Sequence, residues 1–243
     1  MTNKIRAPFN SIFSWYIKKR IHQIELFKKY PFEVQHETLF KLLKKAKDTE
    51  IGKLYDFRSI SSISDFKNRV PLQKYEDVFP YIKRSINGEK NILWPSQIKW
   101  FAKSSGTTTG KSKLIPVSRE SLEECHYKGG KDMLSLYYNN NPNSKLLNGK
   151  CLRLGGSQEL YQSGNTYFGD LSAIIIDNLP LWAEFSSTPS QKTSLIPEWE
   201  YKLKAIIDET INQNVTSLAG IPSWMTVLLN KILEKSGKKS VFE

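Results

Sequence analysis

The stretch of the sequence best suited to chemistry runs from Trp100 to Ser118 and reads WFAKSSGTTTGKSKLIPVS. It brings together a run rich in hydroxyl side chains from Ser104 to Thr109, glycines at 106 and 110, and lysines at 111 and 113. Exposed backbone N–H groups, short hydroxyl donors and ammonium groups can converge on one anion. The spacing therefore predicts a loop that holds a phosphate or polyphosphate.

Two kinds of phosphate loop fit this composition. The segment SGTTTGKS departs from the Walker pattern G-x-x-x-x-G-K-[ST] only at Ser105. A Walker loop must run straight into a helix whose N-terminus faces the phosphates, yet Lys113 is followed by Leu, Ile and Pro116. Pro116 lacks the N–H group that such a helix needs, so the sequence favours a turn between two strands.

The elements that must position this loop follow from hydrophobic periodicity and turn residues. Helical spacing predicts helices over 9–29 and 32–47, followed by short helices broken by Pro71 and Pro80, with Ser64 as an N-cap. A strand should lead into the loop and another should follow it. A helix should then run over 119–140 after the N-cap Ser118, with Gly129 and its neighbour as a place where it can kink.

The second half of the chain is expected to alternate between strands and helices. Strands are predicted at 150–156, 171–176 and 215–221, and helices at 197–213 and from 222 to Gly237. This alternation indicates an α/β fold. We expect a mainly helical N-terminal cap at 1–95, followed by an α/β portion at 96–243.

The composition limits the classes of function. The formal net charge is +12, and residues 1–50 hold 11 Lys or Arg against 5 Asp or Glu, but no nucleic-acid-binding motif accompanies them. We therefore expect a solvated basic face and no nucleic-acid partner. The longest clean apolar run is far too short to span a membrane, and the N-terminus has no secretory signal pattern. Two isolated cysteines and three histidines suggest no metal site and fit a reducing compartment, which favours the cytoplasm.

The loop and its flanks resemble the adenylate-forming enzymes, and among them the acyl-acid amido synthetases, the auxin-responsive family of plants and its bacterial relatives. The similarity rests on an ordered series that covers nearly the whole chain: TEIGKLYDF (49–57), RVPLQKYEDVFPYIKR (69–84), LWP to IPVS (93–118), FGDLSAI (168–174) and GIPSWMTVLL (220–229). The resemblance implies the N-terminal half of a ligase large domain. In that family a carboxylic acid is activated by ATP as acyl-AMP and then conjugated to an amine such as an amino acid.

The resemblance also implies roles for single residues. Lys113 would be the basic, catalytic residue of the loop, with ATP and Mg²⁺ as cofactors. The helix after the loop lines the acyl pocket in the family, which makes His126, Tyr127 and Lys131 candidates for substrate binding; Trp224 could wall a pocket or belong to the core. The residues that would contact or closely approach the ATP phosphates are Ser104, Ser105, Gly106, Thr107, Thr108 and Gly110.

The sequence also departs from the family. The arginine with which the plant enzymes hold the acyl carboxylate is not recognisable in CHYKGGKDMLSLYY, and the adenine, ribose and metal motifs and the C-terminal lid do not follow within the 243 residues. We therefore expect a fragment that is inactive alone. The alternative is a non-catalytic basic α/β module that binds a nucleotide or a partner. The sequence leaves the oligomeric state open.

Overall fold

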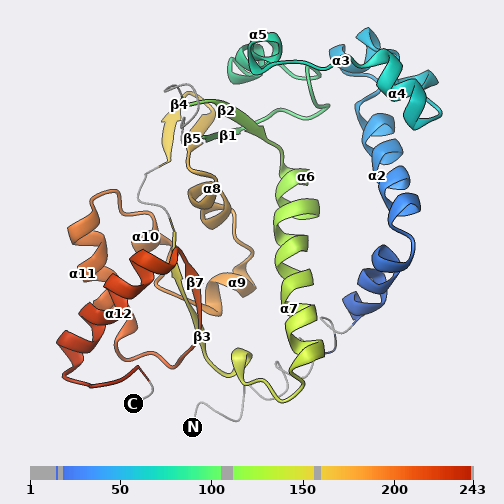
Figure 1. Cartoon of the computed structure of the whole chain (residues 1–243). Coiled ribbons are helices and arrows are strands. Elements are labelled where there is room, and N and C mark those ends of the chain that lie inside the picture. The colour runs from blue at the N-terminus through green and yellow to red at the C-terminus, as the bar shows by residue number, and fades with distance from the viewer. Residues whose placement is uncertain (1–14, 16–18, 105–111, 156–159, 242–243) are drawn as a thin grey trace. The chain divides into compact units, whose positions relative to one another are not determined.

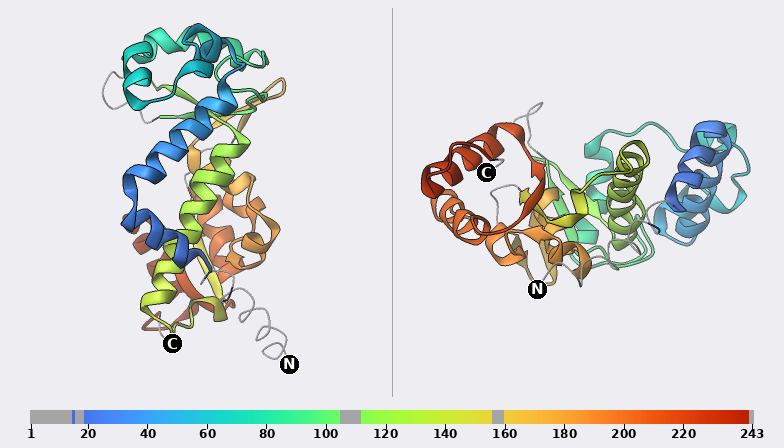
Figure 2. Two further views of the ribbon diagram at one scale, coloured as in Figure 1. Left: turned by 90° about the vertical axis from the view of Figure 1, so that its right-hand side faces the viewer. Right: turned by 90° about the horizontal axis from the view of Figure 1, so that it is seen from below.

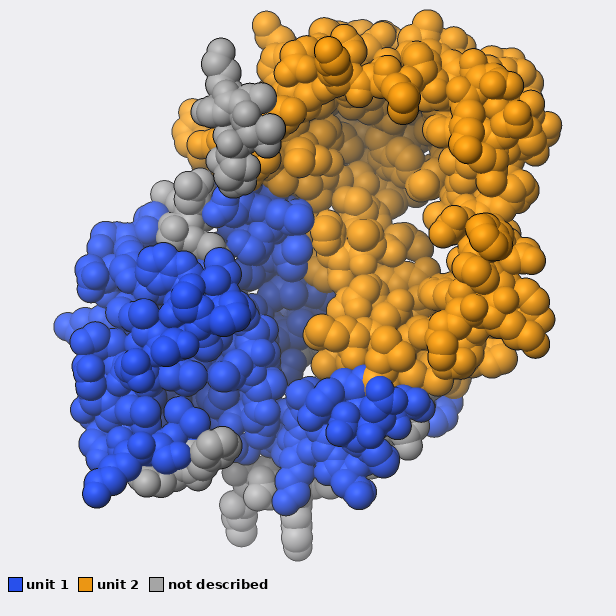
Figure 3. All heavy atoms as spheres, viewed as in Figure 1, with its two compact units in different colours: residues 1–16, 137–160, 169–243 blue, residues 17–136, 161–168 orange. Residues whose placement is uncertain are grey.

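The computed structural model describes residues 15, 19–104, 112–155 and 160–241 (Figure 1). The chain divides into two compact units, which Figure 3 shows in different colours. Unit 1 comprises residues 1–16, 137–160 and 169–243, and unit 2 comprises residues 17–136 and 161–168. Each unit has its own sheet and its own hydrophobic core.

Unit 2 begins with helices. Residues 19–29 are helical, and the next helix starts at Pro31, where the fixed φ of proline suits the first helical position. Both helices were predicted from their apolar stripes, and over the described residues both are confirmed. The helices that follow the first one are α2 (Pro31–Ala46), α3 (Glu50–Leu54), the 3-10 turn η1 (Phe57–Ser59), α4 (Ile63–Arg69) and α5 (Tyr75–Ile86).

Two details of these helices correct the sequence prediction. The N-cap of α4 is Ser62 and not Ser64, because the Ser62 side chain accepts a hydrogen bond from the Asp65 N–H. The prediction that Pro80 breaks a helix was also wrong, since Pro80 lies inside α5. Proline costs such a helix one backbone hydrogen bond, and burial of the opposite face against the core offsets this cost. The α5 residues in that core are Tyr75, Val78, Ile82 and Ile86.

The sheet of unit 2 has the strand order β2-β1-β5-β4 and contains two antiparallel hairpins. Phe101 in β1 is completely buried and stacks on Phe168 in β5, with 5.7 Å between ring centroids. The predicted strands on either side of the glycine loop are therefore confirmed. The strands are β1 (Trp100–Lys103), β2 (Leu114–Val117), β4 (Tyr161–Ser163) and β5 (Thr166–Gly169).

A long helical segment follows β2, as predicted. It consists of α6 (Arg119–Ser121), the π-helical η2 (Leu122–Tyr127) and α7 (Lys128–Asn140). Its N-cap is Ser118, whose hydroxyl accepts from the Ser121 N–H at 3.0 Å. Helix α2 runs along this segment (Figure 2), and ion pairs join Lys41 of α2 to Glu124 and Lys45 of α2 to Glu120.

The sheet of unit 1 is parallel and has the order β6-β3-β7. Leu152 and Leu154 of the central strand face α11 and α12, and these elements together form the core of the unit. Arg153 points to the opposite face, where it meets Glu184 of α9 at 3.0 Å. The 3-10 turn η3 (Leu146–Asn148) precedes the first of these strands, which are β3 (Lys150–Leu154), β6 (Ser187–Thr188) and β7 (Val215–Gly220).

Helices flank this sheet, and the last two match the predicted ones. The final helix ends at Gly237, whose φ of 70° is the left-handed conformation that glycine adopts without strain. The helices of the unit are α8 (Leu171–Asp177), α9 (Leu181–Phe185), α10 (Gln191–Ser194), α11 (Trp199–Thr210) and α12 (Pro222–Ser236).

The predicted strand at 171–176 was wrong, because this segment forms α8. The Ile174 N–H donates to the Asp170 carbonyl four residues earlier, and the buried residues Ala173, Ile174 and Ile176 lie on one helical face. A short apolar run fits a buried strand and a buried helix equally well. Here packing overrides the strand preference of β-branched residues.

The α/β class predicted from the sequence is confirmed by this mixture of helices and sheets. The expected boundary between a cap at 1–95 and a portion at 96–243 stays a prediction. Among the described residues no helix is both long enough and apolar enough to cross a membrane.

Candidate phosphate-binding hairpin

The base of the glycine loop is closed by a reciprocal pair of hydrogen bonds. Next to the pairing of Lys103 with Leu114, the Ser104 N–H donates to the Lys113 carbonyl at 2.9 Å. The Lys113 N–H in turn donates to the Ser104 hydroxyl oxygen, also at 2.9 Å. The two residues at the ends of the loop are therefore fixed against each other.

The middle of the loop is not part of the described structure. The predicted phosphate contacts Ser105, Gly106, Thr107, Thr108 and Gly110 all lie outside the described residues, which resume at Ser112. Of the predicted loop residues, the structure thus places Ser104 and Lys113, and it brings these two together.

The path of the chain after the loop distinguishes the two kinds of phosphate loop. Ser112 and Lys113 are not helical, and the chain then enters β2, in which Pro116 pairs with Phe101. Proline is tolerated there because β2 is an edge strand of the sheet. The next helix begins only at Arg119. The loop therefore joins two antiparallel strands, as predicted, and is not a Walker loop.

The charge of Lys113 is available to a ligand. Its side chain is half-buried, and its ammonium group lies 5.2 Å from the centre of the Tyr75 ring. Within the described part of the chain Lys113 forms no ion pair with a carboxylate. A cation that sits on an aromatic face and keeps its hydrogen-bond donors can bind an anion.

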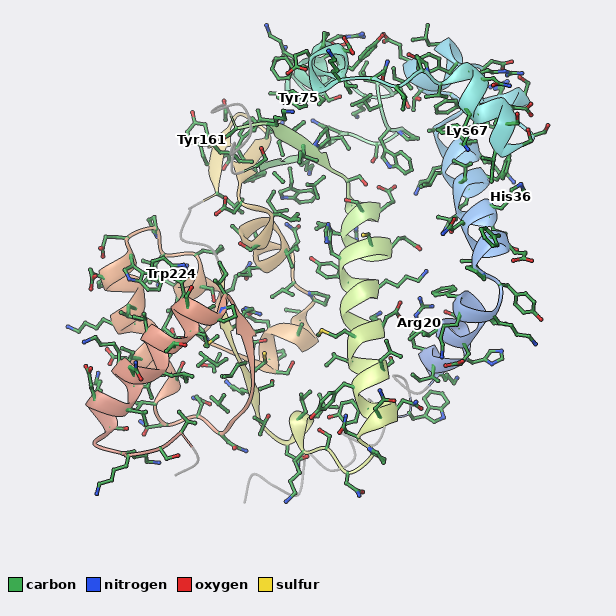
Figure 4. The ribbon with its side chains drawn as sticks, in the orientation of Figure 1. Arg20, His36, Lys67, Tyr75, Tyr161 and Trp224 are labelled. Atoms are coloured by element: carbon green, nitrogen blue, oxygen red, sulfur yellow. The ribbon has the colours of Figure 1, made fainter. Side chains whose placement is uncertain are left out.

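Sequence reasoning missed the residue that contacts this lysine. Tyr75, labelled in Figure 4, is the first residue of α5. Its hydroxyl accepts from the Leu114 N–H at 2.9 Å and lies 3.3 Å from the Leu114 carbonyl oxygen, to which it donates. Tyr75 belongs to the segment RVPLQKYEDVFPYIKR, which carries the family resemblance, and this was the only signal that pointed to it.

The helix after β2 is anchored by a second cluster that the sequence did not reveal. The Trp94 indole N–H donates to Glu120 at 3.0 Å, and Lys45 pairs with the same carboxylate at 2.9 Å while its ammonium lies 5.3 Å from the Trp94 ring centre. Burial alone would raise the pKa of Glu120, but hydrogen bonds from Lys45, the backbone and Trp94 hold this pKa below its ordinary value. Glu120 is therefore a charged anchor at the start of the helix.

The predicted substrate-binding residues fall in two places. His126 and Tyr127 end the π-helical segment η2, and Lys131 lies one turn beyond Tyr127 in α7; all three are half-buried and belong to unit 2. Interruptions of this kind are frequent at functional sites. Trp224 lies on α12 in unit 1, where its ring meets Trp199 edge to face at 4.7 Å.

Within the described ranges, no three His, Cys, Asp or Glu side chains gather in a way that could hold a metal ion.

Comparison with known proteins identifies relatives of this chain. Residues 20–242 match the family model described as GH3 family N-terminal domain. The chain is 36% identical to the indole-3-acetic acid-amido synthetase GH3.2 of Arabidopsis thaliana over 106 residues. This aligned stretch is 43% of this chain and 19% of that protein. It is also 36% identical to the jasmonoyl–L-amino acid synthetase JAR6 of Nicotiana attenuata over 124 residues. This second stretch is 51% of this chain and 20% of that protein.

A solved structure has the same fold. The GH3.15 acyl acid amido synthetase superposes with a TM-score of 0.72 at 22% sequence identity, over 90% of this chain and 39% of that one. The chain therefore spans well under half the length of the proteins it resembles. Because the family match runs through nearly all of its residues, the chain belongs to the GH3 family and carries the N-terminal domain of that family.

Proposed function

We propose that this chain is the phosphate-binding portion of an ATP-dependent acyl-acid amido synthetase. The observation that carries the proposal is the hairpin base, where Ser104 and Lys113 bond to each other and the lysine has no carboxylate partner among the described residues. Its similarity to proteins named as amido synthetases supports the same reaction class.

The proposed reaction has two steps. A carboxylate oxygen of the acid attacks the α-phosphorus of ATP, the bond between that phosphorus and the oxygen bridging it to the β-phosphorus breaks, and pyrophosphate leaves. An amine then attacks the acyl carbon, a proton is lost, and AMP leaves as the amide forms. Both the attacked and the departing phosphates carry negative charge, so the protein must supply fixed donors and positive charge around them.

The residues of the hairpin suit that task. The Ser104 hydroxyl accepts from the Lys113 N–H and can still donate its own hydrogen to a phosphate oxygen. Lys113 would offset charge on the phosphates in the transition state, and Mg²⁺, when bound to the phosphates, would supply further charge neutralisation. The proposed phosphate contacts along the loop are Ser104, Ser105, Gly106, Thr107, Thr108 and Gly110.

The substrates are proposed by class. The acid would be a small-molecule carboxylic acid and the acceptor an amine such as an amino acid, as the names of the similar proteins suggest. We assign His126, Tyr127 and Lys131 to the acid-binding side. Trp224, which belongs to unit 1, stays a separate prediction from the sequence. The cytoplasm, where ATP is abundant and thiols stay reduced, is the proposed compartment.

A second candidate is a basic module that binds a nucleotide or a partner without catalysis. The net charge of +12 favours it, because such a field attracts polyanions whether or not a reaction follows.

The experiment that tests the proposal is ATP–pyrophosphate exchange with a panel of carboxylic acids. It is run in parallel on the 243-residue chain and on the longest translation product of its gene, followed by mass spectrometry of products formed with amino acids. Exchange that needs both ATP and one class of acid supports the synthetase. If nucleotide binds but no acid stimulates exchange in either protein, the binding module is the better account.

A further inference from the structure

Tyr75 occupies the open side of the strand that follows the phosphate loop. In the order β2-β1-β5-β4, β2 is an edge strand and has a neighbouring strand on one side only. Successive residues of a strand direct their N–H and C=O groups to opposite sides. Both backbone groups of Lys113 bond to Ser104 on the β1 side, so those of Leu114 face outward.

The hydroxyl of Tyr75 satisfies both of these outward groups. It accepts from the Leu114 N–H at 2.9 Å and donates to the Leu114 carbonyl at 3.3 Å. One side chain thus replaces the bonds that a further strand would make, and it does so at the residue directly after Lys113. This contact fixes the strand at the point where it leaves the loop.

The ring of Tyr75 acts on the side chain of the same lysine. The Lys113 ammonium lies 5.2 Å from the ring centroid, within the range of an attractive cation–π contact. The ring itself is held by the core of unit 2. The ring centroid of Phe79 lies 5.5 Å away, on the same helix. The start of α5 is held in turn, because the Lys74 N–H donates to the Asp77 carboxylate at 2.9 Å.

We propose that Tyr75 is a positioning residue of the phosphate site: its ring holds the Lys113 ammonium, while its hydroxyl fixes the backbone of the neighbouring Leu114. The inference rests on the proposed function, since it assigns Lys113 to phosphate binding. It differs from a role in packing alone, because a tyrosine that only filled space would affect stability and would not affect phosphate affinity through Lys113.

The test is a titration of the folded 243-residue chain with inorganic tripolyphosphate, followed by NMR. Ionic strength is kept constant with sodium chloride, so that screening of the general attraction to the basic chain stays the same throughout the titration. We expect Lys113→Ala to weaken the affinity by about tenfold, as loss of a charge-assisted contact does. Tyr75→Leu should weaken it by about three- to fivefold, as loss of a cation–π contact does.

A double-mutant cycle shows whether the tyrosine acts through the lysine. In the Lys113→Ala background, Tyr75→Leu should cause no further loss of affinity. Phe79→Leu is the matched control: it removes a ring of the same helix, in contact with Tyr75, that bonds neither to Leu114 nor to Lys113. It should leave the affinity within about twofold of the unmodified chain.

Tyr75→Phe separates the hydroxyl from the ring. This variant keeps the aromatic face, so tripolyphosphate affinity should stay within about twofold of the unmodified chain. It removes the partner of the Leu114 N–H, so hydrogen exchange at that amide should accelerate by about tenfold while amides of β1 stay unchanged.

Each failure identifies what is wrong. If Tyr75→Leu binds tripolyphosphate normally, or if its loss multiplies with that of Lys113→Ala, the positioning role is refuted while the phosphate site stands. If exchange at Leu114 is unchanged in Tyr75→Phe, the backbone contact is refuted. If the unmodified chain shows no saturable binding, or Lys113→Ala binds as tightly, the proposed phosphate site falls and the inference falls with it.

Discussion

The two sheets of the molecule differ in how their strands pair. The sheet of unit 2 is built from antiparallel hairpins, and the loop from Ser104 to Lys113 joins two strands that pair directly with each other. The sheet of unit 1 is parallel, and its central strand pairs with segments far away in sequence, such as Lys150 with Val215. A hairpin brings the two ends of its own loop together, whereas a parallel pair cannot.

The difference shows why the candidate site lies on the hairpin. Ser104 and Lys113 bond to each other because antiparallel pairing continues one step beyond the strands. In unit 1 the sheet is covered by helices, and Ile206 and Leu228 of these helices are completely inaccessible to solvent. We infer that unit 2 presents the loop and that the unit 1 sheet serves mainly as a packed framework.

The largest expected effects come from the two cores. Phe101→Ala should destabilise unit 2 by about 3–5 kcal/mol, because it removes a buried ring stacked on Phe168. Ile206→Ala should destabilise unit 1 by about 2–5 kcal/mol. Native-state hydrogen exchange measures the two units separately. Leu72→Ala, at a fully exposed position, is the control and should change stability by less than about 0.5 kcal/mol.

The comparison would fail if Phe101→Ala left the amides of β1 and β2 protected as before. If each substitution accelerates hydrogen exchange mainly in its own unit, the comparison of the two units is strengthened, because each core then supports its own sheet.

The second effect concerns the charge at the hairpin. In the longest translation product of the gene, Lys113→Ala should lower acid-dependent ATP–pyrophosphate exchange by about tenfold or more, because a cation near the phosphates in the transition state is lost. Lys99→Ala is a suitable control, since Lys99 directly precedes β1, at the end of the strand that is away from the loop. Exchange that is unaffected by Lys113→Ala would remove this lysine from the mechanism.

A smaller effect is expected at the other end of the loop. Ser104→Ala removes the acceptor of the Lys113 N–H and should destabilise the hairpin by about 0.5–1.5 kcal/mol. Faster hydrogen exchange at the Lys113 amide would report this loss. Ser163→Ala, at an exposed position in β4, should leave that amide unchanged. An equally slow Lys113 amide in both variants would contradict the closed base.

The smallest effect is a dependence of stability on pH at Glu120. The pKa of this carboxyl in the folded protein lies below its ordinary value of 4.5, so its stabilising contribution is present above pH 4.5 and is lost as the pH falls through the folded pKa. Glu120→Gln should flatten the acid limb of the stability curve by up to about 1 kcal/mol. Glu123→Gln, on an exposed pair with Arg119, should leave that limb nearly unchanged. Identical acid limbs for the Glu120 variant and the unmodified chain would refute the anchor.

Local signals in the sequence were enough to predict the parts of the fold that depend on neighbouring residues. Pro116 excluded a helix after the loop, Ser118 capped the following helix, and Gly237 ended the last one, because each of these effects acts within one turn. The prediction at 171–176 was wrong because a short apolar run does not reveal whether a helix or a strand buries it.

The contacts that organise the candidate site could not be predicted. Tyr75 and Leu114 are separated by many residues, and nothing in the local pattern shows that a hydroxyl of α5 reaches the edge of β2. The same holds for Trp94, Glu120 and Lys45, which come from three separate segments of the chain. Residue types could suggest a phosphate loop, but only the structure shows what fixes its ends.

The most direct measurement of the central claim is an NMR titration of the isotopically labelled chain with MgATP, observed at backbone amides. The account predicts saturable shift changes that are largest at the amides of residues 104–113, and that are lost at those amides in Lys113→Ala. Shift changes that leave residues 104–113 unmoved and centre on the sheet of unit 1 would contradict it.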